Sequence, residues 1–498
     1  MAQEKEIWFL TGSQNLYGPE TLEQVAAQSK VVVDQLANGL SSEVALIWKP
    51  TLKTNEEIRQ ALSDATHNPN CVGVITWMHT FSPAKMWING LDALRKPLLH
   101  LHTQAGQSLP WSTIDMDFMN LNQAAHGDRE YAHILTRMSM ARKIVVGHPT
   151  SKEVQSSVDA WAFATLGWNA SQNLKLARFG DNMRFVAVTD GDKVAAQIDL
   201  GISVENLGVN TLCDAVDAVS DSAALALTKT YEAEYDVVPE LREGGARHES
   251  LVYAAKQEIA LRGILEQGGY HAFTSNFEDL GTLRQLPGLA VQRLMADGFG
   301  FAGEGDWKTA ALVAILKRMA PAGQGVSFME DYTYHFGPGT PKVLGAHMLE
   351  VCPTITTAKP KLEIHPLGIG GKEDPVRMVF TATPARGRVL CWVDLGDRFR
   401  IISNEVEVVE PTEDLPKLPV ARAVWEPKPT LAISAEAWML SGGSHHTALT
   451  TTVSSETLDD FARMLNVEHV AINSETTSKS IRQELAWSSA YYRLAARL

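Results

Sequence analysis

The segment Lys5-Glu-Ile-Trp-Phe-Leu-Thr-Gly-Ser-Gln-Asn-Leu-Tyr17 begins as an apolar run and ends in a polar turn. Its apolar residues, Ile7–Leu10, are not interrupted by polar ones, which is typical of a strand buried on both faces of a sheet. A helix-like pattern follows at Glu20–Leu40. A buried strand followed directly by a helix predicts the first unit of a parallel α/β sheet.

The same order of strand and helix repeats along the first third of the chain. The predicted strands are Val44–Trp48, Val72–Thr76, Leu98–His102 and Lys143–Val146, and the predicted helices are Asn55–Ala65, Ala84–Leu94 and one that begins at Lys152. Asn55 is a candidate helix N-cap. Ligands of doubly wound sheets bind beyond the carboxyl ends of the strands. Those ends carry Gly12–Tyr17, Trp77–His79 and His102–Gln104.

Two further sections follow. The second is again α/β, and its predicted elements are the strands Lys175–Phe179 and Phe185–Val188 and the helices Glu249–Gln267 and Trp307–Met319. The third has closely spaced strands at Leu362–Ile364, Val376–Ala382, Arg388–Leu395 and Phe399–Val408, then a helical tail from Thr457. Strands with so little helix between them predict antiparallel pairing. The predicted domains are therefore residues 1–174 and 175–325, both α/β, and 326–498, mostly β.

Charge and cysteine content narrow the class of protein. The chain has 44 Lys and Arg against 58 Asp and Glu among 498 residues, a net charge of −14, which disfavours nucleic acid and anionic membranes as partners. Its 4 cysteines are scattered without a CxxC motif, which is typical of reduced thiols. The run Ile7–Leu10 is too short for a signal peptide or a membrane span. We expect a cytoplasmic protein.

The segment Gly298-Phe-Gly-Phe-Ala-Gly-Glu-Gly-Asp-Trp307 contains a glycine pattern that resembles the dinucleotide-binding fingerprint. That fingerprint requires a preceding strand, whereas a helix is predicted at Leu289–Ala296. The context thus argues against a nicotinamide site. Glu304 lies between two glycines, which allow a ligand to approach the backbone closely, and Asp306 is a candidate N-cap of the next helix.

Further acids and histidines follow in apolar surroundings. Glu330 lies in Ser327-Phe-Met-Glu-Asp-Tyr-Thr-Tyr-His335, and His445-His446 lies in a glycine-rich turn. We expect Val343–Cys352 to be a strand, in which alternation places His347 and Glu350 on opposite faces. Two carboxylates and two imidazoles suit a divalent ion such as Mn²⁺. The spacing alone leaves hydrogen-bonded structural roles open for these residues.

Several long motifs carry a resemblance that runs the length of the chain. They are Gly12–Glu20, Trp77–Gly90, Asp115–Gln123, Arg178–Arg184, Phe301–Lys308, Phe328–His335 and Leu367–Lys372. On these motifs the chain resembles the bacterial L-arabinose isomerase family. The resemblance implies two Rossmann-like domains, a C-terminal β-barrel-like domain and a homohexamer. It also implies conversion of L-arabinose to L-ribulose, and of D-galactose to D-tagatose, through an enediol intermediate.

The resemblance further assigns residues. The implied cofactor is Mn²⁺, with Co²⁺ or Mg²⁺ as substitutes and no nucleotide cofactor. The implied metal ligands are Glu304, Glu330, His347 and His446, and the two glutamates form the acid/base pair. Sugar contacts are implied for Gln14, Leu16, His126, Met183, Phe277 and Ile369. The choice of His446 over His445, and which glutamate acts as the base, stay open, as does a hydride shift between C1 and C2.

Two alternative functions remain to be weighed against this expectation. An NAD-dependent sugar dehydrogenase would need a strand before Gly298, which the pattern does not supply. A sugar-binding regulatory protein could keep Gln14 and Met183 but lose the metal ligands, and all four candidate ligands are present.

Overall fold

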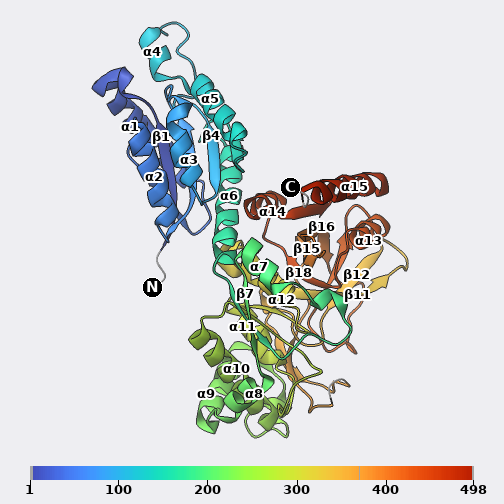
Figure 1. The fold of residues 1–498 in the computed structure, drawn as a ribbon. Coiled ribbons are helices and arrows are strands. Elements are labelled where there is room, and N and C mark those ends of the chain that lie inside the picture. Colours follow the sequence, from blue (N-terminus) through green and yellow to red (C-terminus); the bar gives the residue numbers. More distant parts are fainter. Residues whose placement is uncertain (1–3, 369–370, 496–498) are drawn as a thin grey trace. The chain divides into compact units, whose positions relative to one another are not determined.

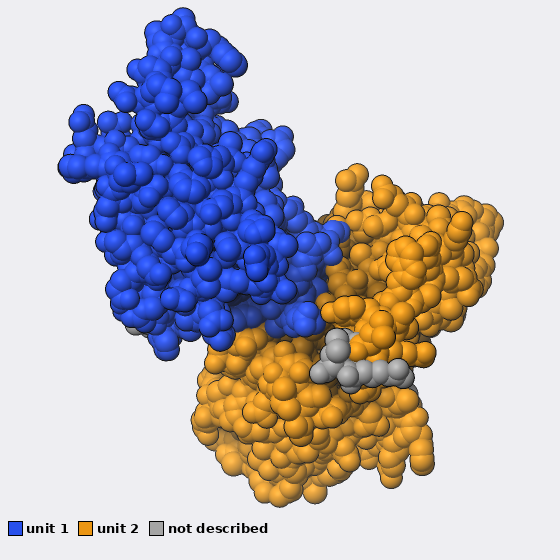
Figure 2. Space-filling view, turned by 45° about the horizontal axis from the view of Figure 1, so that its top comes forward, with its two compact units in different colours: residues 1–169, 454–466 blue, residues 170–453, 467–498 orange. Residues whose placement is uncertain are grey.

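Residues 4–368 and 371–495 are described by the computed structural model. The chain divides into unit 1, residues 1–169 and 454–466, and unit 2, residues 170–453 and 467–498 (Figure 2). The second and third sections of the sequence thus fold within the same unit. Among the described residues, no helix has both the length and the apolar character to cross a bilayer.

Unit 1 is built on a parallel sheet with the strand order β2-β1-β3-β4-β5 (Figure 1). Its strands are β1 (Lys5–Gly12), β2 (Val44–Trp48), β3 (Cys71–Met78), β4 (Leu98–His102) and β5 (Lys143–Val146). Each neighbouring pair is parallel. The predicted doubly wound sheet is confirmed, and β2, β4 and β5 have the predicted bounds.

Helices cover both faces of this sheet, which explains the uninterrupted apolar strands. These helices are α1 (Gly18–Ala37), α2 (Asn55–His67), α3 (Ile88–Ala93), α5 (Ala124–Arg137) and α6 (Lys152–Ser171). The short helix α4 (Met116–Leu121) has no buried residue and does not contribute to this cover. Ile7 and Phe9 pack in one apolar cluster with residues of α1 and α6. Trp8 and Leu10 pack in another with residues of α2, α3 and α5. Alternate residues of β1 therefore pack into two separate apolar clusters, one on each face of the sheet.

Two local predictions in unit 1 need correction. Asn55 is not the N-cap of α2, because Thr54 has the extended backbone and its hydroxyl accepts the Glu57 N–H at 3.2 Å. The predicted helix Ala84–Leu94 begins as a 3₁₀ turn, η2 (Ala84–Trp87), and only then becomes α3.

Unit 2 contains a second parallel sheet, with the order β10-β9-β6-β7. Its strands are β6 (Lys175–Phe179), β7 (Ser203–Leu207), β9 (Ala272–Ser275) and β10 (Gly300–Ala302). The helices are α7 (Lys193–Leu200), α8 (Val209–Asp217), α9 (Asp221–Glu234), α10 (His248–Gly268), α11 (Gly288–Ala296) and α12 (Trp307–Arg318). The predicted strand Phe185–Val188 is wrong. Phe185 has a φ of 67° and a fully exposed side chain, so this apolar run pairs with no sheet and turns into η3 (Ala187–Thr189).

The C-terminal section forms an antiparallel barrel. Its strands are β11 (Val326–His335), β12 (Lys342–Ala346), β15 (Ala385–Asp394), β16 (Phe399–Val409), β17 (Arg422–Pro427) and β18 (His446–Thr450). They pair in the order β15-β18-β11-β12-β17-β16, and β16 closes the ring on β15. Closure removes exposed strand edges. The predicted fold class, two α/β sections followed by a mostly antiparallel β section, is confirmed.

Smaller elements complete unit 2 and the connections. A short sheet contains β8 (Asp236–Val237), β13 (Lys361–Ile364) and β14 (Val376–Val379), and short 3₁₀ turns are η1 (Asn15–Tyr17), η4 (Pro239–Leu241), η5 (Pro321–Gly323) and η6 (Pro353–Ile355). Helix α13 (Leu431–Leu440) precedes β18. The predicted helical tail is divided into α14 (Ser455–Leu465) and α15 (Ser478–Ala495), because β19 (Glu468–Ile472) pairs with β16 between them. All 4 cysteines are buried and free, as predicted.

Candidate active site

Glu304 lies in a sharp turn between β10 and α12 of unit 2. Its φ of 62° is in the left-handed region, which non-glycine residues adopt at an energetic cost and which occurs often at functional sites. The next residue, Gly305, has a φ of 79°, and a Cβ there would lie 2.7 Å from the Cα of Asn182. The backbone of Met183 donates to the Glu304 carbonyl at 2.9 Å. Close packing on the segment 182–183 therefore holds the strained turn.

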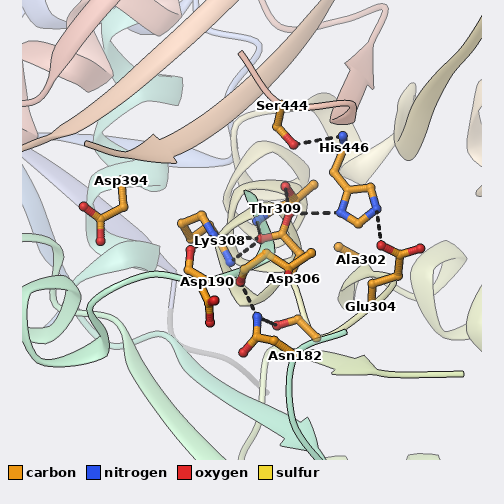
Figure 3. A network of polar contacts seen from close by, with 12 residues as sticks. Asn182, Asp190, Ala302, Glu304, Asp306, Lys308, Thr309, Asp394, Ser444 and His446 are labelled. Carbon is orange, nitrogen blue, oxygen red and sulfur yellow. Dashed lines mark hydrogen bonds and ion pairs between the residues drawn. The ribbon is translucent and has the colours of Figure 1, made fainter. Parts of the chain in front are cut away.

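Asp306 caps α12 and also connects to a histidine, as Figure 3 shows. Its carboxylate accepts the backbone N–H groups of Lys308 and Thr309 at 3.2 and 3.3 Å. The Nζ of Lys308 lies 3.3 Å from the same carboxylate, and both side chains are buried. Burial would raise the pKa of Asp306, but the charge of Lys308 and the hydrogen bond from His446 outweigh it and hold this pKa well below its usual range. Asp306 is thus a buried anion.

His446 opens β18 and is completely buried. Its Nδ1 lies 3.1 Å from Oδ2 of Asp306, so the charged carboxylate places the ring proton on Nδ1. The other ring nitrogen, Nε2, then carries a lone pair and lies 3.6 Å from Oε2 of Glu304. Within the described part of the chain, this buried Nε2 has no hydrogen-bond partner. A histidine held by a carboxylate with its second nitrogen unsatisfied is the arrangement found at metal-ligating histidines.

His347 follows the last residue of β12 rather than lying within a strand. Its Nδ1 is 2.5 Å from Oε2 of Glu350, so the prediction that these two residues face opposite ways is wrong. The strand ends at Ala346, and alternation does not apply to the turn that follows. Burial lowers the pKa of His347, but the Glu350 carboxylate raises it more, and the net change is a rise. The ring of Phe328 packs against His347 with centroids 4.8 Å apart.

Glycine is required beside His347. A Cβ on Gly303 would lie 3.0 Å from Cε1 and 3.2 Å from Nε2 of the His347 ring. Those distances are shorter than ordinary van der Waals contact, so the imidazole reaches its position because residue 303 has no side chain.

Glu330 comes to the site through strand pairing. In the register of the barrel, Glu330 of β11 lies opposite Ala346 on one side and His446 on the other. The antiparallel ladder thus brings three segments together that are far apart in sequence. Burial raises the pKa of the Glu330 carboxyl, although His347 and His446 oppose the change.

The predicted ligands converge around His446. Ligand atoms of Glu304, His347 and His446 all lie within 4.8 Å of one another, and so do those of Glu330, His445 and His446. His445 differs from its neighbour, because its side chain is 41% exposed and its Nε2 is 4.0 Å from the Glu330 carboxylate. Burial and the nearby His446 lower the pKa of His445 to about 4. Of the two adjacent histidines, His446 is the one held by Asp306.

The residues predicted to contact sugar fall on both units. In unit 2, Phe277 lines a small cavity together with Glu304 and His347, and Met183 contacts the Glu304 backbone. In unit 1, Gln14 donates to the carbonyl of Phe81 at 3.0 Å, and His126 stacks on the Phe81 ring with centroids 4.6 Å apart. Phe81 therefore contacts both Gln14 and His126. Leu16 is 82% exposed, and Ile369 lies outside the described residues.

Three residues of this site were not singled out by the sequence analysis for the roles their contacts give them. They are Lys308, the cation beside Asp306; Glu350, the partner of His347; and Phe328, whose ring packs against both His347 and His446. A signal existed for Phe328, because strand alternation places it on the same face as Glu330. None existed for Glu350, whose contact depends on where β12 ends.

Sequence comparisons identify the family of the chain. Family models described as the N-terminal, central and C-terminal domains of L-arabinose isomerase match residues 1–173, 175–322 and 325–468. The chain belongs to the L-arabinose isomerase family. An L-arabinose isomerase from Nocardioides sp. is 59% identical, with 99% of this chain and 98% of the relative covered. Those from Clavibacter sepedonicus and Geobacillus stearothermophilus are 57% and 54% identical, each over 98% of this chain and 97% and 98% of the relatives. Members of the L-arabinose isomerase family are aldose–ketose isomerases, and this chain is an enzyme of that class.

Proposed function

We propose that this enzyme converts L-arabinose to L-ribulose with a divalent metal ion, and D-galactose to D-tagatose as a second reaction. The observation that carries the metal is the buried Nε2 of His446, which has no partner among the described residues and faces Glu304. The relatives named L-arabinose isomerase support the sugar.

The donor set fits the proposed ion. Glu304, Glu330, His347 and His446 offer two carboxylates and two imidazoles, a mixture that suits Mn²⁺, with Co²⁺ or Mg²⁺ as substitutes. Such a set leaves coordination positions for sugar oxygens. When bound, the ion would polarise the sugar carbonyl and make the adjacent C–H more acidic.

The chain's own residues then move the protons. In the proposed reaction one of the two carboxylates, Glu304 or Glu330, removes the proton from C2 and returns it to C1, and the other transfers the hydroxyl proton. The intermediate between these steps is an enediol.

Other residues would orient the groups that react. Asp306 keeps the proton of His446 on Nδ1, and Glu350 does the same for His347. Phe328 excludes water from one side of the two imidazoles. We propose that Gln14, Leu16, His126, Met183, Phe277 and Ile369 contact the sugar, as the family resemblance implies. The proposed assembly is a homohexamer.

The test is ketose formation from L-arabinose by protein stripped with EDTA, before and after Mn²⁺ is restored. We expect activity to disappear and return. Glu304→Gln and Glu330→Gln are expected to remain folded and lose turnover, whereas Glu426→Gln on β17, which pairs with Lys342 at 3.1 Å, serves as a matched control and keeps it. Unchanged activity after complete metal removal would refute the metal, and absence of ketose under both conditions would refute the substrate.

A further inference from the structure

A second cavity lies in unit 1, at the amino ends of the strands, whereas Gln14 lies at their carboxyl ends. It has a volume of about 210 Å³ and opens where β4 and β5 begin, at Leu98 and Lys143. Gln14, in contrast, follows the carboxyl end of β1. Helices α6 and α14 form the remaining walls. Figure 1 shows these two helices beside each other, and a hydrogen bond between Ser157 and Glu456 joins them.

The lining of this cavity is strongly basic. Its charged residues are the cations Arg95, Lys96, Arg142, Lys143 and Arg463 and the single anion Asp460. The cavity therefore carries a formal charge of 5 − 1 = +4, in a chain whose net charge is −14. Like charges repel in the absence of counterions, so such a cluster in an acidic protein needs an explanation.

Most of these cations have no acidic partner. Within residues 4–368 and 371–495, no ion pair involves Arg95, Lys96 or Arg142. Lys143, in contrast, pairs with Glu456 and Asp460 of α14, and Arg463 interacts electrostatically with Asp460. The Nε of Arg142 is buried and has no hydrogen-bond partner in the same range. Burial lowers the pKa of Lys96, which is the direction expected of a cation that lacks a compensating charge.

The cavity also has an aromatic wall. Trp161 and Trp168 of α6 line it, and the Nζ of Lys96 lies 5.8 Å from the centroid of the Trp168 ring. A cavity of about 150 Å³ holds a benzene ring, so the cavity between the sheet and α14 accommodates a molecule somewhat larger. Aromatic faces pack against the C–H groups of such a body while cations bind its charged end.

We propose that this cavity is a binding site for a phosphate monoester of sugar size. A phosphate monoester carries close to two negative charges at neutral pH and presents three acceptor oxygens to arginine and lysine donors. Its sugar body packs against Trp168, which is partly exposed, whereas Trp161 behind it is buried. The ligand is distinct from the sugar assigned to the active site, because a neutral pentose offers no charge to the unpaired cations.

Binding at this cavity would hold α14 on the sheet of unit 1. Helix α14 belongs to unit 1, whereas β18 before it and β19 after it belong to unit 2. The strand before it, β18, begins with His446. A phosphate that binds both Arg463 of α14 and Lys96, just before β4, bridges this helix and the sheet of unit 1.

The test is titration calorimetry of the full-length protein at low ionic strength with ribose 5-phosphate, inorganic phosphate and ribose. We expect ribose 5-phosphate to bind once per chain and to weaken as NaCl is added, because its contacts are ionic. Inorganic phosphate should bind at least about tenfold more weakly, since it lacks the body that contacts Trp168. Ribose should not bind at this site.

Variants locate the binding. Lys96→Gln and Arg463→Gln should each weaken ribose 5-phosphate binding by about tenfold, because each removes a charge-assisted hydrogen bond. Lys85→Gln and Arg59→Gln, at exposed positions of unit 1 outside the cavity, are the matched controls and should leave it unchanged. Failure of ribose 5-phosphate to bind overturns the proposal. Equal affinity in Lys96→Gln and Lys85→Gln also overturns it, because the ester would then bind elsewhere, and equal affinity for ester and inorganic phosphate overturns the choice of an ester.

Discussion

Asp306→Asn separates the two roles that the structure gives this carboxylate. Asparagine has nearly the same shape and keeps Oδ1, so it still caps the backbone N–H groups of Lys308 and Thr309. It replaces Oδ2 by an amide NH₂, which cannot accept the proton of His446 Nδ1. Without this acceptor, the Nδ1–H tautomer of His446 is no longer favoured over the Nε2–H tautomer. In the Nε2–H tautomer, the nitrogen that faces Glu304 has no lone pair with which to bind the proposed metal ion.

The expected magnitudes follow from these contacts. Loss of the group that orients a metal-ligating histidine weakens metal affinity by about tenfold to a hundredfold. The substitution also removes the negative charge 3.3 Å from the buried Lys308 ammonium, and breaking a buried ion pair destabilises a protein by about 3–5 kcal/mol. Lys308 keeps its hydrogen bond to the carbonyl of Asp190. We therefore expect the lower end of that range, about 3 kcal/mol.

The assay measures both effects on the same variant. Mn²⁺ affinity is measured by competition with a chelator of known affinity, and stability by urea denaturation of the metal-free protein. Asp394→Asn is the matched control, because Asp394 also accepts a backbone N–H, from Asp192 at 2.7 Å, in the same part of the molecule (Figure 3). Thr309→Val removes the hydroxyl that donates to Oδ2 at 2.7 Å and retains the charge. An Asp306→Asn variant that is destabilised but binds Mn²⁺ as tightly as the native protein would refute the orienting role and reduce Asp306 to a helix cap.

Three further changes test other parts of the structure. Gly303→Ala should weaken Mn²⁺ binding while the protein stays folded, because its Cβ would displace the His347 ring from a 3.0 Å approach; unchanged affinity, measured by chelator competition, would contradict this. His79 is buried, and burial lowers its pKa from 6.5 to about 4, so the unfolded chain binds a proton that the folded chain does not, and stability falls as the pH drops below 6.5. This costs about 2 kcal/mol between the His79 reference pKa and about pH 5, and urea midpoints of His79→Gln should lack that part of the decline. Thr54→Ala should cost about 1 kcal/mol in thermal unfolding through loss of the α2 cap, whereas Asn55→Ala should cost less, and the reverse order would restore the cap to Asn55.

Local sequence determined most of the secondary structure in unit 1. The uninterrupted apolar run Ile7–Leu10 identified a strand buried on both faces, and two separate apolar clusters now lie on those faces. The bounds of β2, β4 and β5 were also predictable, because apolar runs end where polar turns begin. Asp306 was identified as a cap from its position alone, since capping depends only on neighbours in the first turn of the helix.

The candidate site depended more on tertiary structure. Motif resemblance named Glu304, Glu330, His347 and His446, but local patterns could not show that they converge. Their convergence requires the strand register of the barrel. In that register Glu330 lies opposite His446, although the two residues are far apart in the sequence. Such pairings are set by packing of the whole sheet and leave no local periodicity.

The clearest limits of sequence were at chain turns. Alternation placed His347 and Glu350 on opposite faces, whereas the end of β12 at Ala346 let their side chains meet at 2.5 Å. The apolar run Phe185–Val188 fitted a strand, but Phe185 has a left-handed backbone and an exposed ring. Sequence determined which residues could bind a metal and which runs could be buried, because residue type and short-range periodicity carry that information. Tertiary structure decided which of them meet, because strand ends and strand register are set by contacts between distant segments.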